Sequence, residues 1–195
     1  LFMAATAAES DTVIELTGEG FDVLDFSALA ATVPVNANLA STTTTLATHT
    51  NRTLRVTAIA NLPFFEHLIG GAGNDVLRAD GGNQRIEGRD GNDTITGGAG
   101  NDSLIGGLGD DMYLFAATTA AETDVITELA NEGTDKLDFT ALTATTSVTA
   151  DLGNDAALAT HANRTLITAA AGQAANIENA IGRSEEHTSE LQSHH

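Results

Sequence analysis

The amino-acid sequence predicts an all-β fold: a flattened coil of short strands and tight turns, flanked on both sides by β-rich repeat segments. Three observations predict this fold. Residues 70–114 follow a nine-residue period, turn-forming residues recur in each period, and a longer segment occurs nearly twice in the 195 residues. A fixed short period is typical of stacked units that bury an apolar face only against their neighbours.

The five nine-residue units are GGAGNDVLR, ADGGNQRIE, GRDGNDTIT, GGAGNDSLI and GGLGDDMYL. Their fourth position is always glycine: Gly73, Gly82, Gly91, Gly100 and Gly109. Their sixth is Asp75, Gln84, Asp93, Asp102 and Asp111, and their eighth is Leu77, Ile86, Ile95, Leu104 and Tyr113. Gly, Asn and Asp suit turns, and a single inward apolar residue suits a very short strand. Two units, or 18 residues, should therefore make one revolution of the coil.

This geometry predicts where negative charge gathers. Units n and n+2 fall on one side, so Asp75, Asp93 and Asp111 form one column, and Gln84 and Asp102 belong to the opposite column. Neighbouring coils lie about 4.8 Å apart, and bare carboxylates at that spacing repel one another. Calcium resolves the conflict because it binds carboxylate and carbonyl oxygens, whereas magnesium demands stricter geometry.

Other readings of the glycine-rich turns are less favoured. The repeats contain no Cys and no His, which disfavours zinc and copper. Solenoid turns without metal remain an alternative, but they give no reason for Asp at position six. A dinucleotide-binding loop would have to open a helix, and nothing helical is predicted after these glycines.

GGAGNDVL, GGAGNDSL and GGLGDDMYLF resemble the RTX, or haemolysin-type, calcium-binding nonapeptide GGxGxDxUx. The resemblance implies a parallel β-roll with calcium between same-side turns, held by carbonyls of the first four positions and by the Asp at position six. The best sites would lie between residues 70–75 and 88–93 and between 88–93 and 106–111. The site between 79–84 and 97–102 should be weak or empty, because Gln84 offers only an amide oxygen. The implied metal-site residues are Gly70, Gly71, Gly73, Asp75, Gly88, Asp90, Gly91, Asp93, Gly97, Gly98, Gly100, Asp102, Gly106, Gly107, Gly109 and Asp111.

The composition limits the possible partners. The net charge of −19 argues against nucleic acid and anionic membrane surfaces as partners. Aromatic residues make up 4 % of the chain and Trp is absent, which favours a thin solenoid core. Cys is absent, so no disulfide framework is available, and no run of 18 apolar residues predicts a membrane span. Without metal, the acidic repeats should repel one another and remain largely disordered, and metal binding should drive folding.

The longer repeat has a period of about 112 residues. LFMAATAAESD at residues 1–11 corresponds to LFAATTAAETD at 114–124, and THTNRTL at 48–54 corresponds to THANRTL at 160–166. We therefore divide the chain into a first β-rich flank (1–69), the nonapeptide roll (70–114) and a second flank (115–182). Residues 183–195, RSEEHTSELQSHH, resemble a translated sequencing adapter and are treated as a non-native tail.

The flanks should continue the solenoid or form a sandwich beside it, because their alternating residues favour short strands. TGEGFDVLD at 17–25 and ANEGTDKLD at 130–138 look like degenerate nonapeptides, which leaves calcium at Asp22 or Asp135 open, with a solvated strand edge favoured. Alanine-rich residues 4–8 and 169–175 could form helical turns. His49 and His161 are expected to be structural, and Arg52 and Arg164 to pair with flank carboxylates.

The leading functional hypothesis is a calcium-binding, non-catalytic repeat segment of a secreted or surface bacterial protein, part of an adhesin-like array whose target is open. The resemblance implies export by type I secretion machinery and folding on extracellular calcium. No catalytic motif supports an enzyme active site in this chain. The alternatives are the C-terminal portion of an RTX enzyme (a protease, lipase or epimerase) and a fragment of a pore-forming toxin.

Overall fold

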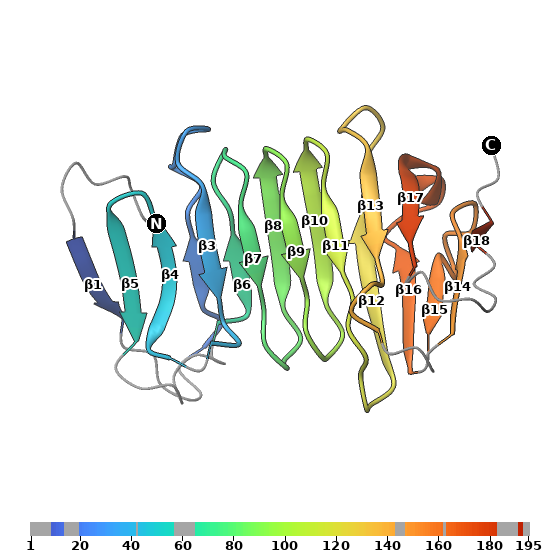
Figure 1. Cartoon of the computed structure of the whole chain (residues 1–195), viewed down its shortest axis with the longest axis horizontal. Coiled ribbons are helices and arrows are strands. Elements are labelled where there is room, and N and C mark those ends of the chain that lie inside the picture. Colours follow the sequence, from blue (N-terminus) through green and yellow to red (C-terminus); the bar gives the residue numbers. More distant parts are fainter. Residues whose placement is uncertain are drawn as a thin grey trace.

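Two β-sheets of nine strands each face one another along the length of the molecule (Figure 1). The computed structural model describes residues 9–13, 20–41, 43–56, 65–142, 147–161, 163–182 and 191–192. In order across sheet A, the strands are β1 (Glu9–Val13), β5 (Arg52–Val56), β4 (Thr45–His49), β3 (Val35–Asn38), β7 (Val76–Arg78), β9 (Thr94–Thr96), β11 (Met112–Leu114), β13 (Asp135–Asp138) and β17 (Ile177–Ile181). In order across sheet B, they are β18 (Leu191–Gln192), β14 (Val148–Asp151), β15 (Ala159–His161), β16 (Arg164–Thr168), β12 (Glu122–Thr127), β10 (Ser103–Leu108), β8 (Arg85–Asp90), β6 (His67–Ile69) and β2 (Val23–Asp25). The predicted all-β class is confirmed.

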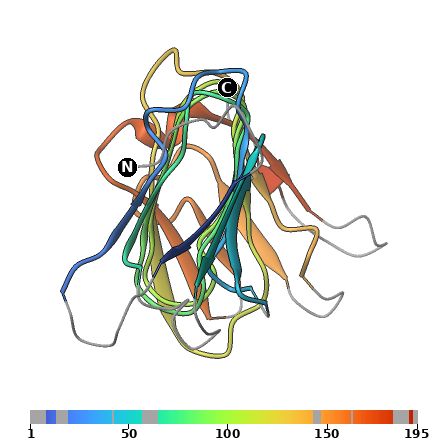
Figure 2. The ribbon, with the colours of Figure 1, turned by 90° about the vertical axis from the view of Figure 1, so that its left-hand side faces the viewer.

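The nonapeptides form the predicted parallel coil. Strands from alternate units share a sheet, so Leu77 pairs with Ile95 in sheet A and Ile86 pairs with Leu104 in sheet B. The offset between equivalent residues of successive coils is 18. Seen from the end, these coils superimpose as one flattened ring (Figure 2). The parallel β-roll and its two-unit revolution are therefore confirmed.

Position-four glycines allow the turns of successive coils to stack closely. Gly100 and Gly109 have φ angles of 104° and 128°, a region that L-residues rarely adopt. A Cβ at Gly100 would overlap the carbonyl oxygen of Gly82, and one at Gly109 would overlap that of Gly91. Gly91, Gly100 and Gly109 thus meet two requirements, a left-handed backbone and contact with the coil before them.

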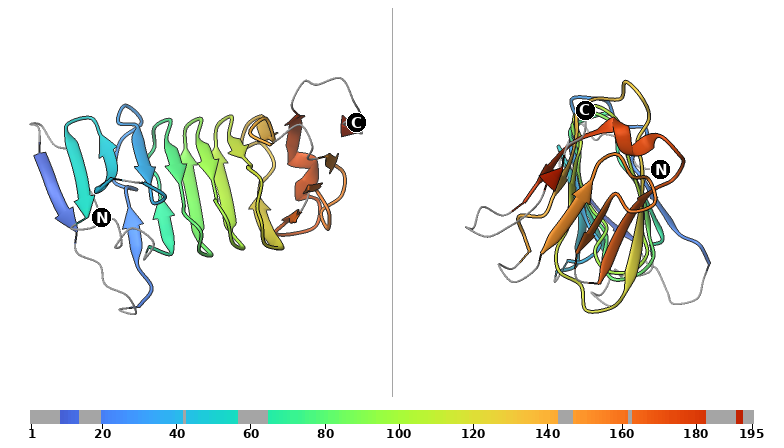
Figure 3. Two further views of the ribbon diagram at one scale, coloured as in Figure 1. Left: turned by 60° about the horizontal axis from the view of Figure 1, so that its bottom comes forward. Right: turned by 90° about the vertical axis from the view of Figure 1, so that its right-hand side faces the viewer.

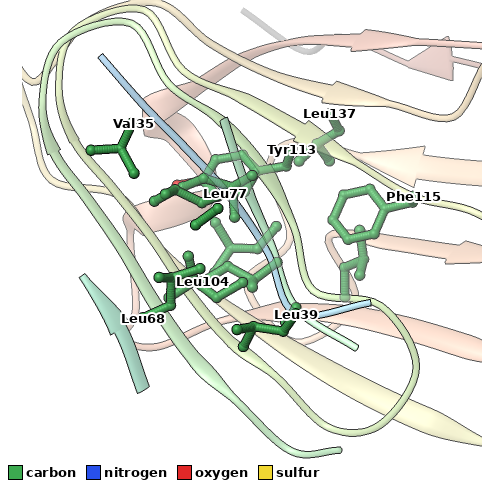
Figure 4. Close-up of a cluster of buried hydrophobic side chains, with 14 of the residues drawn as sticks. Val35, Leu39, Leu68, Leu77, Leu104, Tyr113, Phe115 and Leu137 are labelled. Atoms are coloured by element: carbon green, nitrogen blue, oxygen red, sulfur yellow. The ribbon is translucent and has the colours of Figure 1, made fainter. Parts of the chain in front are cut away.

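The core is a thin layer of side chains between the two sheets. All five position-eight residues are fully buried at 0 % exposure: Leu77, Ile86, Ile95, Leu104 and Tyr113. Figure 4 shows Leu77, Leu104 and Tyr113 close together in the space that the coil encloses. Phe115 and Phe139 extend this layer into the second flank, with ring centroids 5.4 Å apart. A low content of aromatic residues suffices because the layer is only one side chain deep on each sheet.

In the flanks, the roll continues but includes antiparallel strands. β3, β4 and β5 run as an antiparallel meander within sheet A, and β14, β15 and β16 do the same within sheet B (Figure 3). The parallel neighbours of these meanders keep the roll going, as β3 pairs with β7 and β16 pairs with β12. Of the two flank architectures left open by the sequence, the structure shows the continued solenoid.

The two copies of the flank lie on opposite sheets. β1 belongs to sheet A and its counterpart β12 to sheet B, while β2 belongs to sheet B and its counterpart β13 to sheet A. Among the described residues, one period of the long repeat contains the five nonapeptide strands, β7 to β11, and four flank segments. These four are β1, β2, the meander of β3 to β5 counted as one, and β6. Each segment is half a revolution, so the odd total of nine moves every flank element to the other face.

Two smaller expectations concern the chain outside the strands. A 3-10 helix, η2 (Gln173–Asn176), overlaps the alanine-rich stretch 169–175 for which a helical turn was predicted. Residues 4–8 lie outside the described residues, as does most of the tail, of which only β18 is described, pairing with β14. Within the described part of the chain, no helix has the length and apolar character that crossing a bilayer requires.

We expect Leu77→Ala to lower the free energy of unfolding of the folded chain by about 2–5 kcal/mol, because it leaves a cavity in the thin core. Val76 precedes it on the same strand but faces outward at 45 % exposure, so Val76→Ala should change stability by about 0.5 kcal/mol or less. Urea unfolding followed by circular dichroism measures both. Equal losses for the two variants would contradict the assigned inner and outer faces of β7.

Candidate metal centre

The position-six carboxylates form the two predicted columns along the roll. In the first column, the Asp75 Oδ1 accepts a hydrogen bond from the backbone N–H of Val35 at 2.7 Å. Asp93 and Asp111 repeat this contact, each accepting from the backbone N–H of the aspartate one coil back, at 2.7 and 2.8 Å. Asp135 continues the column by accepting from Asp111 at 2.9 Å. All four residues are 1 % exposed.

The second column follows the same rule on the opposite side of the roll. The Asp102 Oδ1 accepts from the backbone N–H of Gln84 at 2.9 Å, and the Asp124 Oδ1 accepts from that of Asp102 at 3.1 Å. Asp124 was not assigned to the column from sequence, because the coil that contains it is 22 rather than 18 residues long. The columns therefore extend beyond residues 70–114 into the second flank.

In each of these carboxylates, the Oδ1 accepts the hydrogen bond that joins two coils. In the middle of the columns, the Oδ2 accepts no hydrogen bond from the described residues. The Oδ2 atoms of Asp93, Asp102 and Asp111 are buried and receive no hydrogen bond from any residue that the structure describes. Burial raises the pKa of Asp93 to about 8 and those of Asp102 and Asp111 to about 7. Buried polar atoms normally have a partner, so these oxygens mark positions suited to a cation.

A backbone carbonyl lies beside the unpaired oxygen of Asp93. A Cβ at Gly88 would overlap the Oδ2 of Asp93 and would be 2.6 Å from the carbonyl oxygen of Gly106 in the next coil. Gly70 and Gly88, the first glycines of their turns, thus leave room for a carboxylate and a carbonyl oxygen of the next coil to meet. Oxygen donors without nitrogen or sulfur are the ligands that calcium prefers, and the site residues fit that ion.

The structure brings most of the predicted ligands together in these turns, with two differences. Asp75 is engaged through both oxygens, because its Oδ2 accepts from the backbone N–H of Gly71 at 2.6 Å. Asp90 has an exposed side chain, so its backbone carbonyl is the atom it can offer. The remaining predicted residues are turn glycines of the same coils: Gly70, Gly73, Gly91, Gly97, Gly98, Gly100, Gly107 and Gly109.

Sequence reasoning missed Asp80 in the unit that lacks a position-six aspartate. The Gln84 Nε2 donates to the Asp80 Oδ1 at 2.6 Å. The Gln84 Oε1 and the Asp80 Oδ2 are buried, and neither is hydrogen-bonded within the described part of the chain. Asp80 therefore supplies a carboxylate beside Gln84. The signal was present in the sequence, since this is the one unit with aspartate at position two.

A guanidinium group lies at the end of the second column. Arg164 forms ion pairs with Glu122 and with Asp124, the latter at 3.1 Å, and it donates to the carbonyl oxygen of Gly98. The three charged residues are 5 % exposed or less. Gly98 is a turn residue whose carbonyl was predicted to face an ion, so here a side chain of the protein itself provides the positive charge.

The first flank has the same arrangement in a more exposed form. Arg52 pairs with Glu9 at 2.5 Å and with Asp11 at 3.2 Å, and the arginine side chain is 19 % exposed. The prediction that Arg52 and Arg164 pair with flank carboxylates is confirmed.

The two histidines lie in the core of the flanks. The ring of His49 meets that of Phe26 at 5.9 Å, and the ring of His161 meets that of Phe139 at 5.6 Å, both edge to face. Burial lowers the pKa of both histidines. Their ring nitrogens are buried and have no hydrogen-bond partner among the described residues, so a structural role stays a prediction.

The family model of the RTX calcium-binding nonapeptide repeat (4 copies) matches residues 64–86 and 78–113. No curated protein matches the chain. Residues 64–113 are thus RTX repeats, and RTX nonapeptide repeats bind calcium. This repeat is a structural calcium-binding element rather than a catalytic one.

We expect Arg164→Met to destabilise the folded chain by about 3–5 kcal/mol, because it leaves the Glu122 and Asp124 carboxylates buried without their counter-ion. Arg52→Met is the matched control in the exposed copy, where the loss should be about 1 kcal/mol or less. Urea unfolding at one fixed calcium concentration measures both variants. A smaller loss for Arg164→Met than for Arg52→Met would contradict a structural role of the buried guanidinium group.

In calcium-free buffer, the roll should lose stability as the pH rises. The pKa of Asp93 is about 8 and that of Asp102 about 7 in the folded chain, against an ordinary value of 3.8 for both. The stabilisation from a raised acid is fully present below its unfolded pKa and is lost as the pH rises through the folded value. Thermal unfolding in EGTA should therefore give a Tm that falls between about pH 4 and about pH 8. A Tm that rises over this range would contradict the burial of uncompensated carboxylates.

Proposed function

We propose that this chain, whose residues 64–113 are RTX repeats, is a non-catalytic structural segment that folds when calcium ions bind between its coils. The single observation that carries the proposal is the set of buried Oδ2 atoms of Asp93, Asp102 and Asp111, which lack donors among the described residues. The carbonyl oxygen of Gly106 lies beside the Oδ2 of Asp93. Bound calcium supplies the positive charge that lets these carboxylates remain ionised in the folded chain.

The first column supports a site between the turns 88–93 and 106–111. Asp93 and Asp111 each have an oxygen left over after joining the coils, and Gly88 leaves space beside the carbonyl of Gly106. The site between 70–75 and 88–93 has one fewer free oxygen, since both oxygens of Asp75 accept backbone hydrogen bonds. We therefore propose that it binds calcium more weakly than its neighbour.

The second column supports a site between the turns 79–84 and 97–102. Gln84 alone would make it weak, but the Asp80 Oδ2, the Gln84 Oε1 and the Asp102 Oδ2 are three buried oxygens without donors in the described residues. We propose that Asp80 provides the charge that Gln84 lacks. This site holds calcium rather than remaining empty.

The acidic charge of the chain and the usual secretion of RTX repeat proteins support folding outside the cell. The sequence has a net charge of −19, so the columns oppose folding when calcium is scarce and favour it when calcium is abundant. RTX repeat proteins are typically secreted. We propose export of the unfolded chain through type I secretion machinery, and folding at extracellular calcium of roughly 10⁻⁴–10⁻³ M, the range of extracellular modules.

The repeat of about 112 residues supports an adhesin-like array over the C-terminal part of an RTX enzyme. The two flank copies occupy equivalent strands on opposite sheets, so a further copy would continue the roll with the same half-revolution rule. In this proposal, residues 1–69, 70–114 and 115–182 are segments of one continuous roll.

Calcium titration of residues 1–182, followed by circular dichroism, tests this function. β-structure should appear with calcium and should not appear with magnesium. Asp93→Ala should raise the calcium concentration needed for half-maximal folding by about 10-fold or more, because Asp93 serves two sites of one column. Gln84→Ala should have a clearly smaller effect, since Asp80 remains.

Two results would contradict the proposal. Equal shifts for Asp93→Ala and Gln84→Ala would show that the columns are wrongly assigned. Unchanged β-structure at neutral pH in excess EGTA would show that the roll does not depend on an ion.

A further inference from the structure

Glu128 takes the place of a turn glycine where the nonapeptides end. β10 and β12 pair so that Leu104 matches Ile126 and Ile105 matches Thr127. The next residues along the chain are Gly106 in β10 and Glu128 just after β12, so the glutamate stands one coil beyond the first glycine of the last nonapeptide. Its side chain does not turn outward, because Glu128 is 0 % exposed. The interior of the roll thus contains a carboxylate side chain at the position where the preceding coil has a glycine.

Glu128 meets two members of the first column. Asp111, Glu128 and Asp135 each place a carboxylate oxygen within 4.8 Å of the others, and all three residues are buried. They come from three different places in the fold: the turn before β11, the end of β12 and the start of β13. Three carboxylates therefore converge where neither bulk water nor salt screens their charges.

The hydrogen bonds around the three carboxylates leave two oxygens without a partner. The Tyr113 hydroxyl donates to the Glu128 Oε1, and the backbone N–H of Asp111 donates to the Asp135 Oδ1. The Glu128 Oε2 and the Asp111 Oδ2 are buried and accept nothing from the described residues. An unpartnered buried oxygen on each of two facing carboxylates points to a bound cation.

We infer that Asp111, Glu128 and Asp135 form an additional calcium site that closes the last nonapeptide coil. The inference rests on the proposed function but adds a site of different composition. The sites within the repeats combine aspartates with turn carbonyls, whereas this one brings three carboxylate side chains together. Ligand charge tunes calcium affinity, so this site should bind more tightly than those within the repeats.

Surrounding residues favour calcium over other ions and hold Glu128 in position. All the converging groups are oxygens, which suits a hard cation. Magnesium retains its waters, and the complete burial of Glu128 leaves little room for them. Tyr113, itself 0 % exposed, directs one glutamate oxygen by its hydrogen bond and leaves the other free for the ion.

A shared proton is the rival explanation for the cluster. Burial raises the pKa of Glu128 to about 9, so a neutral glutamic acid could bridge to Asp135 without any ion. Glutamine mimics the neutral acid in shape and hydrogen bonding but cannot provide the charge. Glu128→Gln therefore separates the two explanations.

The experiment uses terbium as a luminescent substitute for calcium, on the full chain. Tyr113 is the chain's only tyrosine and Trp is absent, so tyrosine-sensitised emission reports ions close to Tyr113. Glu128→Gln should raise the terbium concentration for half-maximal emission by about 10-fold or more. Glu132→Gln removes the same charge from the same turn, outside the three-carboxylate cluster, and should stay within about 2-fold of wild type.

Calcium binding by equilibrium dialysis on the same proteins decides the outcome. Wild type should bind one calcium more than Glu128→Gln at a concentration that fills this tighter site in the wild-type chain but leaves the repeat sites largely empty. If Glu128→Gln retains wild-type calcium capacity and emission, this site is overturned, while calcium-dependent folding of the roll still stands. If wild type binds no calcium, the proposed function fails with it. Should Glu128→Gln not fold, Asp135→Asn takes its place with the same expected loss, and unchanged capacity there would overturn the site.

Discussion

The structure depends on the buried carboxylates at position six of the nonapeptides, whose two oxygens have different environments. At position six of each coil, one oxygen accepts the backbone N–H of the preceding coil, as the Asp93 Oδ1 does at 2.7 Å from the Asp75 nitrogen. This contact sets how coils stack, because every coil is joined to the next through the same side chain. The second oxygen is buried by the same arrangement, so the fold creates a need for positive charge wherever it joins two coils.

The protein meets this need in several ways along the roll. Within the repeats, unpaired carboxylate oxygens suit a divalent ion, and that of Asp93 adjoins a turn carbonyl. At the end of the second column, the guanidinium group of Arg164 lies between Glu122 and Asp124. At the end of the first column, Tyr113 donates to Glu128. A side-chain cation thus neutralises the end of the second column. The regular turns, and the cluster of Asp111, Glu128 and Asp135 at the end of the first column, are the parts of the roll that need an ion.

The period of the sequence also governs the symmetry of the molecule. Nine half-revolutions separate a flank element from its copy, so β1 and β12 lie on different sheets although they share sequence. Their arginine clusters therefore lie on opposite faces. They also differ in burial, because Arg164 contacts the turn at Gly98 whereas Arg52 is 19 % exposed. Similar local sequence acquires different energetics through its place in the roll.

The sequence alone determined the coil. The nine-residue period, glycine at position four and aspartate at position six suffice to predict the two-unit revolution, the columns and the inward apolar residues, because each follows from local turn chemistry and a fixed repeat. Only the tertiary structure could decide what meets across coils of unequal length. Asp124, Glu128 and Asp135 join the columns through offsets of 22 and 24 residues, and Asp80 compensates for Gln84 through a side-chain contact. Such contacts depend on how far an insertion bulges before the chain returns to the sheet, and no periodic pattern in the sequence encodes that distance.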